Sequence, residues 1–114
     1  MASNPADHSS AQKPPAWDPR DRNFTLKQYT RKLQLWLHAT DLKPDQILPN
    51  VIMQLQGLAL EVGYHMTSEE MLNGGRFEGM SRDPVTLLLL RLHAAFGAEQ
   101  DEMEMAMFAE YHQF

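Results

Sequence analysis

Cysteine is absent from this sequence, which excludes disulfide bonds, thiolate zinc sites, iron–sulfur clusters and thiol nucleophiles. Nothing indicates a secreted, disulfide-stapled product, so we expect an intracellular, cytoplasmic protein, with access to the nucleus left open. Long apolar runs are also missing. The longest, at residues 85–90, is interrupted by Thr86 and closed by Arg91, whereas a membrane-spanning helix needs roughly 18 to 20 apolar residues. We therefore expect no membrane partner.

Basic residues are outnumbered by acidic ones. The 114 residues include 10 Lys and Arg against 15 Asp and Glu, a net charge of −5. A dedicated nucleic-acid reader needs clustered Lys and Arg to contact phosphates, so this balance disfavours that class. The charge is also unevenly distributed: residues 1–43 carry seven basic and four acidic side chains, whereas residues 44–114 carry three and eleven. Such asymmetry can orient one copy of a molecule against another.

The length is that of one small domain preceded by a polar leader. Residues 1–22 are rich in Pro, Ser and Asp and contain Trp17 as their one aromatic residue, so we predict a disordered leader there. Trp17 is expected to dock back onto the domain. Residues 23–114 form the predicted domain, an all-α fold in which about five helices pack as a small orthogonal bundle.

A first helix is predicted from Thr25 to about Thr40. Thr25 and Gln28 match a capping box, in which the two side chains satisfy backbone N–H groups at the helix start. Apolar residues recur at helical spacing and form the predicted core face, with Leu35 at its flank: Leu26, Tyr29, Leu33, Trp36 and Leu37. The opposite face has no acidic residue and carries three cations: Lys27, Arg31 and Lys32.

The start of the second helix is harder to predict. Pro44 is typical of a first helical turn, but Pro49 cannot lie in a regular helix interior without disruption. We therefore place the start of this helix near Pro49. Leu55 is expected to face inward, and Gly57 to end the segment.

Two further short helices are predicted before residue 76. Helix formers dominate residues 58–66 and no partner strand is visible, so a helix is preferred there to a strand. A brief helix opens at the cap-like residue Thr67 and ends at residues 73–75. Residues 76–80 are interpreted as a loop.

The most buried helix is predicted after residue 81, where Asp83 precedes Pro84 at a helix start. Its core residues repeat at helical spacing up to a break at Gly97 and include Leu88, Leu89, Leu92 and Phe96. A final amphipathic helix is predicted over residues 98–114. It lacks a stop signal, so we expect the domain to be truncated at its C-terminus.

No pattern in the sequence indicates catalysis. The five histidines never form the i, i+4 pair of a zinc hydrolase, and no serine lies in a nucleophile motif. The glycine-rich segment at residues 74–79 lacks the Lys-Ser/Thr ending of a phosphate-binding loop. We therefore predict no catalytic residue, metal site, cofactor or small-molecule substrate.

These residues together resemble the N-terminal part of the Gag-like capsid region of long-terminal-repeat retrotransposon polyproteins of the Copia and Gypsy type. The resemblance spans about residues 15–114. The residues that carry it are Trp17-Asp18, Phe24, Tyr29, Leu33, Trp36-Leu37, Leu55-Gln56-Gly57-Leu58-Ala59 and Phe96-Gly97.

The resemblance implies an all-α capsid lobe that self-associates into shells around element RNA. By this analogy Trp36 and Leu37 are core residues, Gly57 allows a close turn between helices, and Phe96 closes the bundle. The sequence has no zinc knuckle and no basic tail. RNA is therefore expected as a partner only through downstream segments that are missing here.

The charge pattern suggests how copies would meet. We hypothesise that the three cations of the first helix on one copy face the acidic segment of the last helix on another, with Met105 as an outward apolar residue. The acidic residues concerned are Glu99, Asp101, Glu102 and Glu104. A contact of this type joins two different surfaces and builds rings or open arrays. The competing interpretation is that these charges pair within one molecule or face water.

Two other functions remain open. The first is a domesticated helical adapter that binds another protein's helix in a groove and stays monomeric until its partner arrives. The second, more distant, is a small nucleic-acid-binding helical domain, which salt-sensitive binding would reveal.

Overall fold

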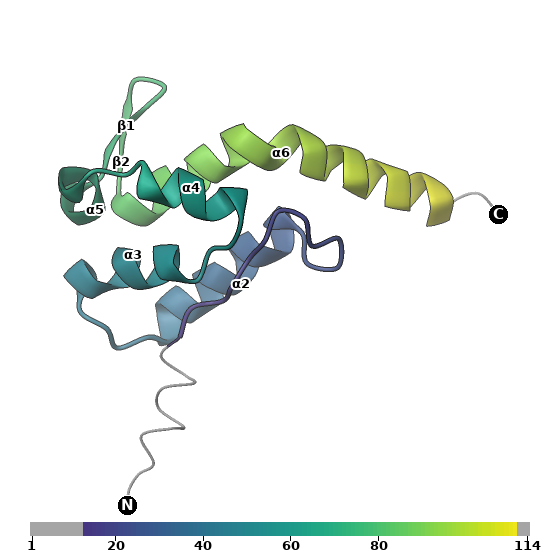
Figure 1. The fold of residues 1–114 in the computed structure, drawn as a ribbon. Helices are drawn as coiled ribbons and strands as arrows, with labels where there is room; N and C mark the ends of the chain where they lie inside the picture. Colours follow the sequence, from purple (N-terminus) through teal and green to yellow (C-terminus); the bar gives the residue numbers. More distant parts are fainter. Residues whose placement is uncertain (1–12, 112–114) are drawn as a thin grey trace, which may run out of the picture.

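A computed structural model describes the backbone of residues 13–111 and the side chains of residues 13–98. Within this range the chain forms five helices and one two-stranded sheet (Figure 1). The fold is thus mostly helical, as predicted, but not purely α. The elements in chain order are α2 (Leu26–Ala39), α3 (Pro44–Met53), α4 (Leu58–Tyr64), α5 (Ser68–Asn73), β1 (Gly75–Phe77), β2 (Met80–Arg82) and α6 (Pro84–Tyr111).

Helix α2 begins and ends where the sequence predicted. The Gln28 N–H donates to Thr25 Oγ1 at 3.2 Å, and the Thr25 N–H donates to Gln28 Oε1 at 2.9 Å, which completes the capping box. The core face is buried at Leu26, Tyr29, Leu33 and Trp36. Leu37, at the edge of this face, is half-buried.

Trp17 lies inside the core, as predicted, with 1% of its surface exposed. Its indole N–H donates to the Phe24 carbonyl at 2.9 Å, and its ring stacks on Tyr29 at 5.7 Å between centroids. Phe96 meets the same ring edge-on at 5.7 Å. Packing therefore begins ahead of residue 23, where the sequence placed the start of the domain. Residues 1–12 of the predicted leader lie outside the described residues.

Helix α3 begins at Pro44, so the prediction of a start near Pro49 was wrong. Pro49 lies inside the helix and is exposed. Its missing N–H leaves only the Asp45 carbonyl without a helical donor, and Asp45 is in the exposed first turn, where water can satisfy it. Leu55, just after the helix, is buried as predicted.

Gly57 supplies the turn between α3 and α4. Its φ of 59° lies in the left-handed region, which glycine adopts without steric cost. The choice of helix for the next segment is confirmed by α4, which buries Ala59 and Gly63 against the core. A Cβ at position 63 would meet Ile52 Cγ2 at 2.7 Å, so α3 and α4 approach closely there.

The predicted loop over residues 76–80 is instead the turn and flanks of a β-hairpin. Strands β1 and β2 are antiparallel, with Gly75, Arg76 and Phe77 opposite Arg82, Ser81 and Met80. The two turn residues both have positive φ, 52° at Glu78 and 81° at Gly79, as a type I′ hairpin requires. Asn-Gly or Asp-Gly is the usual signal for this turn, and the Glu-Gly pair in the sequence is a weaker one.

Helix α6 is one continuous helix, so the predicted break at Gly97 was wrong. Its start is the predicted one, because the Asp83 carboxylate accepts a hydrogen bond from the Thr86 N–H at 3.2 Å. An interior glycine costs about 1 kcal/mol relative to alanine, which weakens a helix without ending it. The core side of α6 is buried at Leu87, Leu88, Leu92 and Phe96, whereas Leu89 is half-buried.

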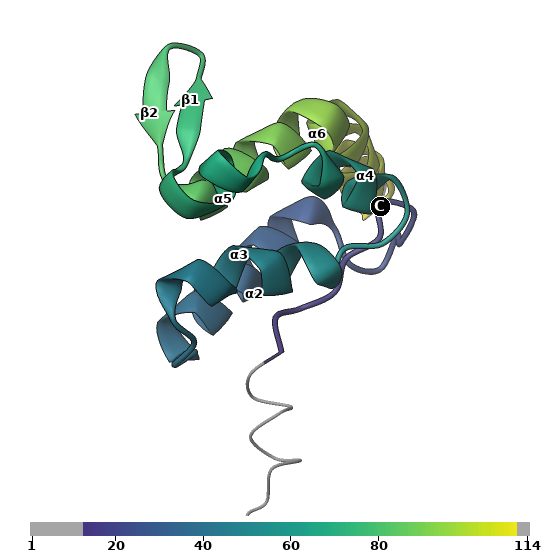
Figure 2. The same cartoon turned by 60° about the vertical axis from the view of Figure 1, so that its left-hand side comes forward.

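The helices form two layers around the core. Figures 1 and 2 show α2 and α3 on one side and α4, α5 and α6 on the other, with the hairpin projecting from the second layer. Helix α6 contacts α2, α4, α5 and β1, while α3 contacts α4 and α5. Beyond Phe96, α6 extends away from the rest of the molecule (Figure 1).

Candidate interaction surfaces

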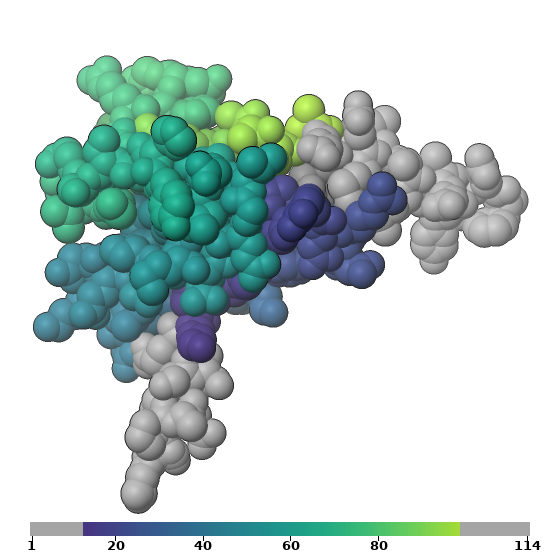
Figure 3. Space-filling model, viewed as in Figure 1, coloured from purple at the N-terminus to yellow at the C-terminus, as the bar shows by residue number. Residues whose placement is uncertain are grey.

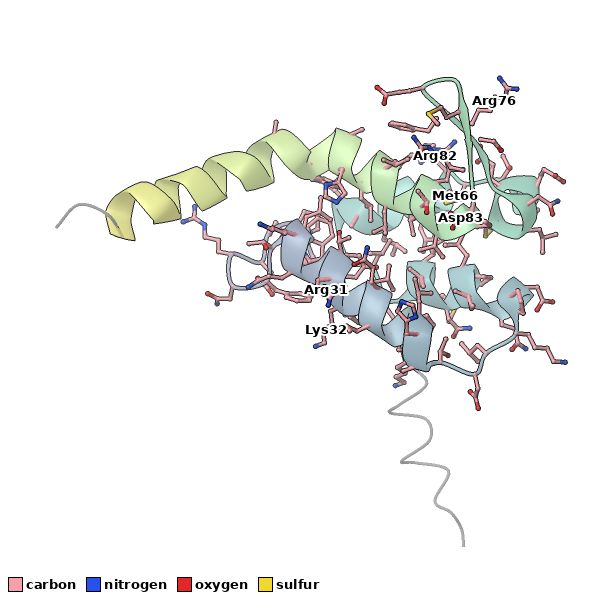
Figure 4. All side chains as sticks on the ribbon, turned by 180° about the vertical axis from the view of Figure 1, so that it is seen from behind. Arg31, Lys32, Met66, Arg76, Arg82 and Asp83 are labelled. Carbon is pink, nitrogen blue, oxygen red and sulfur yellow. The ribbon has the colours of Figure 1, made fainter. Side chains whose placement is uncertain are left out.

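The basic face of α2 is exposed along its length. Lys27, Arg31 and Lys32 are all solvent-exposed, and Figure 4 shows Arg31 and Lys32 on the side of α2 turned away from α6. The ion pairs among the described side chains are Arg20–Asp18 and Arg91–Glu70. None of the three cations is therefore neutralised by a described carboxylate.

Lys32 is held in place by an aromatic residue. Its Nζ lies 5.6 Å from the centroid of the Phe24 ring, within the range of a cation–π interaction. Phe24 in turn packs edge-on against Tyr29 at 6.4 Å. Through Phe24, the part of the basic face at Lys32 is thus connected to the core.

The acidic half of the hypothesised contact has a described backbone only. Residues 99–111 belong to α6, but their side chains lie outside the described residues. The side chains concerned are those of Glu99, Asp101, Glu102, Glu104 and Met105. Their contact with the basic face therefore stays a prediction.

Leu35 was missed as a candidate interaction residue. The sequence placed it at the flank of the core stripe, but 54% of its surface is exposed. It lies four residues after Arg31 and three after Lys32, which places all three on one side of the helix. The basic face of α2 therefore has an apolar centre, and this i, i+3, i+4 spacing was the signal available in the sequence.

Two hollows lie beside α4. Figure 3 shows the α4 region at the surface of the molecule, in front of α6. The first, of about 520 Å³, is lined by Glu61, Val62, His65, Thr67, Glu70 and Arg91. The second, of about 470 Å³, is lined by Asp18, Pro19, Arg20, Gly57, Leu58 and Glu61. Leu58 and Tyr64 on α4 are exposed by 68% and 66%, so this side of the molecule also presents apolar surface.

Each hollow contains one ion pair between residues of its own lining. In the first, the Arg91 guanidinium donates to both oxygens of Glu70, at 3.0 and 2.7 Å, and thereby holds the pKa of Glu70 at about 2. In the second, the side chain of Arg20 donates to Asp18 and lowers the pKa of that carboxyl. These pairs connect α5 to α6 and close the turn after Trp17, so their observed role is structural.

Residues that could hold a metal are scattered. Among the described residues, no group of three or more His, Asp and Glu side chains is arranged to bind an ion. Nδ1 of His65, the residue after α4, hydrogen-bonds the Glu61 carbonyl at 2.7 Å. In the same part of the chain, no helix is both long and apolar enough to cross a membrane.

Comparison with protein families, with curated proteins and with solved structures finds no match to this chain. The resemblance to Gag-like capsid regions stays a prediction made from the residues.

Proposed function

We propose that this chain is a non-enzymatic structural module that associates with copies of itself, in the manner of a capsid lobe of a Gag-like retrotransposon polyprotein. The orthogonal arrangement of helices expected of such a lobe is part of the proposal. Any packaging of element RNA is assigned to other segments of such a polyprotein, because the exposed cations of this domain are few.

The observation that carries the proposal is the projection of α6. Among the described side chains of α6, which end at residue 98, Phe96 is the last in the core. The helix continues from Gly97 to Tyr111, a further length of about 22 Å at 1.5 Å per residue. Four of the residues at positions 99–104 are acidic. The exposed face of α2 carries the opposite charge.

The two charged segments of one molecule are poorly placed to meet each other. Thr30 Oγ1 lies 3.2 Å from His93 Nε2, so α6 crosses α2 on the side occupied by Thr30 and the core residues. Arg31 and Lys32 point away from α6 (Figure 4). A straight α6 therefore offers its acidic segment to another molecule, and repeating that contact builds rings or open arrays.

The charges in this contact mainly set orientation. An exposed ion pair contributes about 0 to 1 kcal/mol and weakens with salt. Apolar residues on the same surfaces are then needed for affinity. Association is accordingly expected to be weak for single contacts and to increase steeply with protein concentration.

Sedimentation velocity of the full chain, at low and high salt, tests this proposal. Reversal of the basic face (K27E/R31E/K32E) and of the acidic segment (E99K/D101K/E102K/E104K) should each abolish association, and an equimolar mixture of the two variants should restore it. The control variant K13E/K43E/R76E changes three exposed cations elsewhere and has the same net charge as the first variant. A wild-type chain that stays monomeric, or a mixture that fails to associate, would contradict the proposal.

A second candidate, a helical adapter for another protein, is favoured by the two hollows beside α4. Such an adapter would be monomeric at high concentration, whereas a capsid-like module would not. The wild-type sedimentation experiment therefore separates the two functions.

A further inference from the structure

Residues 14–17, which lie ahead of α2, form a strap against the core. Pro14 and Trp17 are both buried. The Trp17 N–H donates to the Gln54 carbonyl at 3.4 Å, and the Gln56 N–H donates to the Trp17 carbonyl at 2.9 Å, so the strap pairs with the turn between α3 and α4. The Trp17 indole N–H donates to the Phe24 carbonyl. The ring is therefore held both through its backbone and through its nitrogen.

This ring meets α6 at the point where the helix leaves the domain. Nearer its start, α6 is held by the hairpin and by α5, because Leu87 lies against Gly75 and Arg91 pairs with a carboxylate of α5. At the other end of the buried half, the Trp17 ring packs edge-on against Phe96. We call residues 97–111 of α6 the arm; they project beyond this contact (Figure 1).

A small movement at Phe96 becomes a large one at the end of the arm. At 1.5 Å per residue, Phe96 lies about 12 Å along the helix axis from the buried Leu88, and Tyr111 lies about 35 Å from it. If α6 tilts as a rigid rod about Leu88, a displacement of about 2 Å at Phe96 moves Tyr111 by about 6 Å. The packing at Phe96 therefore controls the direction of the arm.

We propose that Trp17 is a positioning residue for the arm: held by the strap, its ring fixes Phe96 and with it the direction in which α6 leaves the domain. The inference rests on the proposed self-association and adds what controls it, because a segment that binds a second copy binds better when it is already held in one direction. Displacement of the strap would then release the arm without unfolding α6.

Distances between spin labels can test this role, since the chain has no cysteine of its own. The labelled pair Q34C/A109C reports the direction of the arm. The pair Q34C/S68C lies on exposed positions of the two helix layers and reports whether the core is intact. Labelled chains are diluted into an excess of unlabelled chains, so that double electron–electron resonance measures distances within one molecule.

Four substitutions are compared in this background. W17L and F96L remove the ring contact from its two sides and keep each position apolar. W17F retains a ring beside Phe96. L48A is the control, because it removes core volume from α3, which packs against α4 and α5, and leaves both aromatic residues in place.

The arm distance should be sharply distributed in the wild type and in W17F. W17L and F96L should each broaden its distribution roughly twofold, as the lever predicts, should leave the core distance unchanged, and should weaken association in sedimentation. L48A should leave the arm distribution narrow although it lowers stability. A broad distribution in the wild type, narrow ones in W17L and F96L, or equal broadening in L48A would overturn the inference.

Loss of the core distance would show that a variant is unfolded. If W17L unfolds, F96L decides; if both unfold, the contact belongs to the stability of the core and the inference is overturned. The proposed function is judged separately. A wild type that stays monomeric contradicts that function even if W17L releases the arm, whereas a chain that associates equally well with and without the Trp17 ring retains the function and refutes the role of Trp17.

Discussion

Replacing Glu70 by Gln should destabilise the domain at neutral pH, and the loss should disappear in acid. Glu70 accepts two hydrogen bonds from Arg91 and one from the Thr67 N–H. These bonds, those from Arg91 first and that from Thr67 second, lower its pKa from a usual 4.5 to about 2. At about 1.4 kcal/mol for each tenfold change in proton affinity, the ceiling is roughly 3 kcal/mol. The side chains are 22% and 28% exposed, so solvent screening reduces the expected loss to about 1–2 kcal/mol.

The pH dependence follows from the sign of this change. Because the folded-state pKa of Glu70 lies below the unfolded value, its stabilisation is complete above about pH 5 and is lost as the pH falls toward 2. The assay is urea unfolding of the wild type and E70Q between pH 2 and 7, followed by fluorescence of the buried Trp17 and Trp36. A control, E69Q, changes an exposed neighbour and should have little effect. A gap between wild type and E70Q that is equally large at pH 2 and pH 7 would refute the reasoning.

Three glycine substitutions test the backbone directly. Gly74→Ala should lower the free energy of unfolding by more than about 2 kcal/mol, because φ is +79° and the new Cβ would overlap the Arg82 carbonyl. Gly79→Ala, at φ +81° with open space around the new Cβ, should lower it by only about 1 kcal/mol. Equal losses of stability in thermal unfolding would contradict the packing given for the hairpin. Gly97→Ala should stabilise the chain by about 0.5–1 kcal/mol, because Gly97 is helical and the nearest described side-chain atom to an added Cβ, on His93, is 4.0 Å away. A loss of stability or of helical circular dichroism would instead indicate a break there.

The parts of the fold that depend on local patterns could be predicted from the sequence. Both capping boxes, at Thr25 and Thr67, mark helix starts correctly, because the side chain and backbone groups involved lie within four residues. The apolar stripe of α2 identifies its buried face for a similar reason. Trp17 was expected to dock because a lone aromatic beside a domain gains much by burial.

The errors arose where the usual preference of one residue was outweighed by its surroundings, or where the sequence carries only a weak signal. Pro49 and Gly97 both resemble helix breakers. The carbonyl that Pro49 leaves without a donor, that of Asp45, lies in an exposed turn, and Gly97 lies among strong helix formers. The hairpin depends on two positive φ angles, one of them at Glu78, which no residue propensity favours. Leu35 was overlooked because its position at the flank of the apolar stripe left open whether the core covers it, and the packed fold shows that 54% of its surface is exposed.

The wrongly predicted break at Gly97 bears on the proposed function, because that function depends on α6 being continuous. A hinge at Gly97 would leave the acidic segment free to fold back on the basic face of its own molecule, and the charges would then cancel within one chain. As a single helix, α6 holds that segment in a fixed direction, so the entropy cost of ordering it is already met before two copies meet. Gly97→Ala should therefore strengthen association as well as stability, whereas Gly97→Pro, which breaks the helix, should weaken association in the same sedimentation assay.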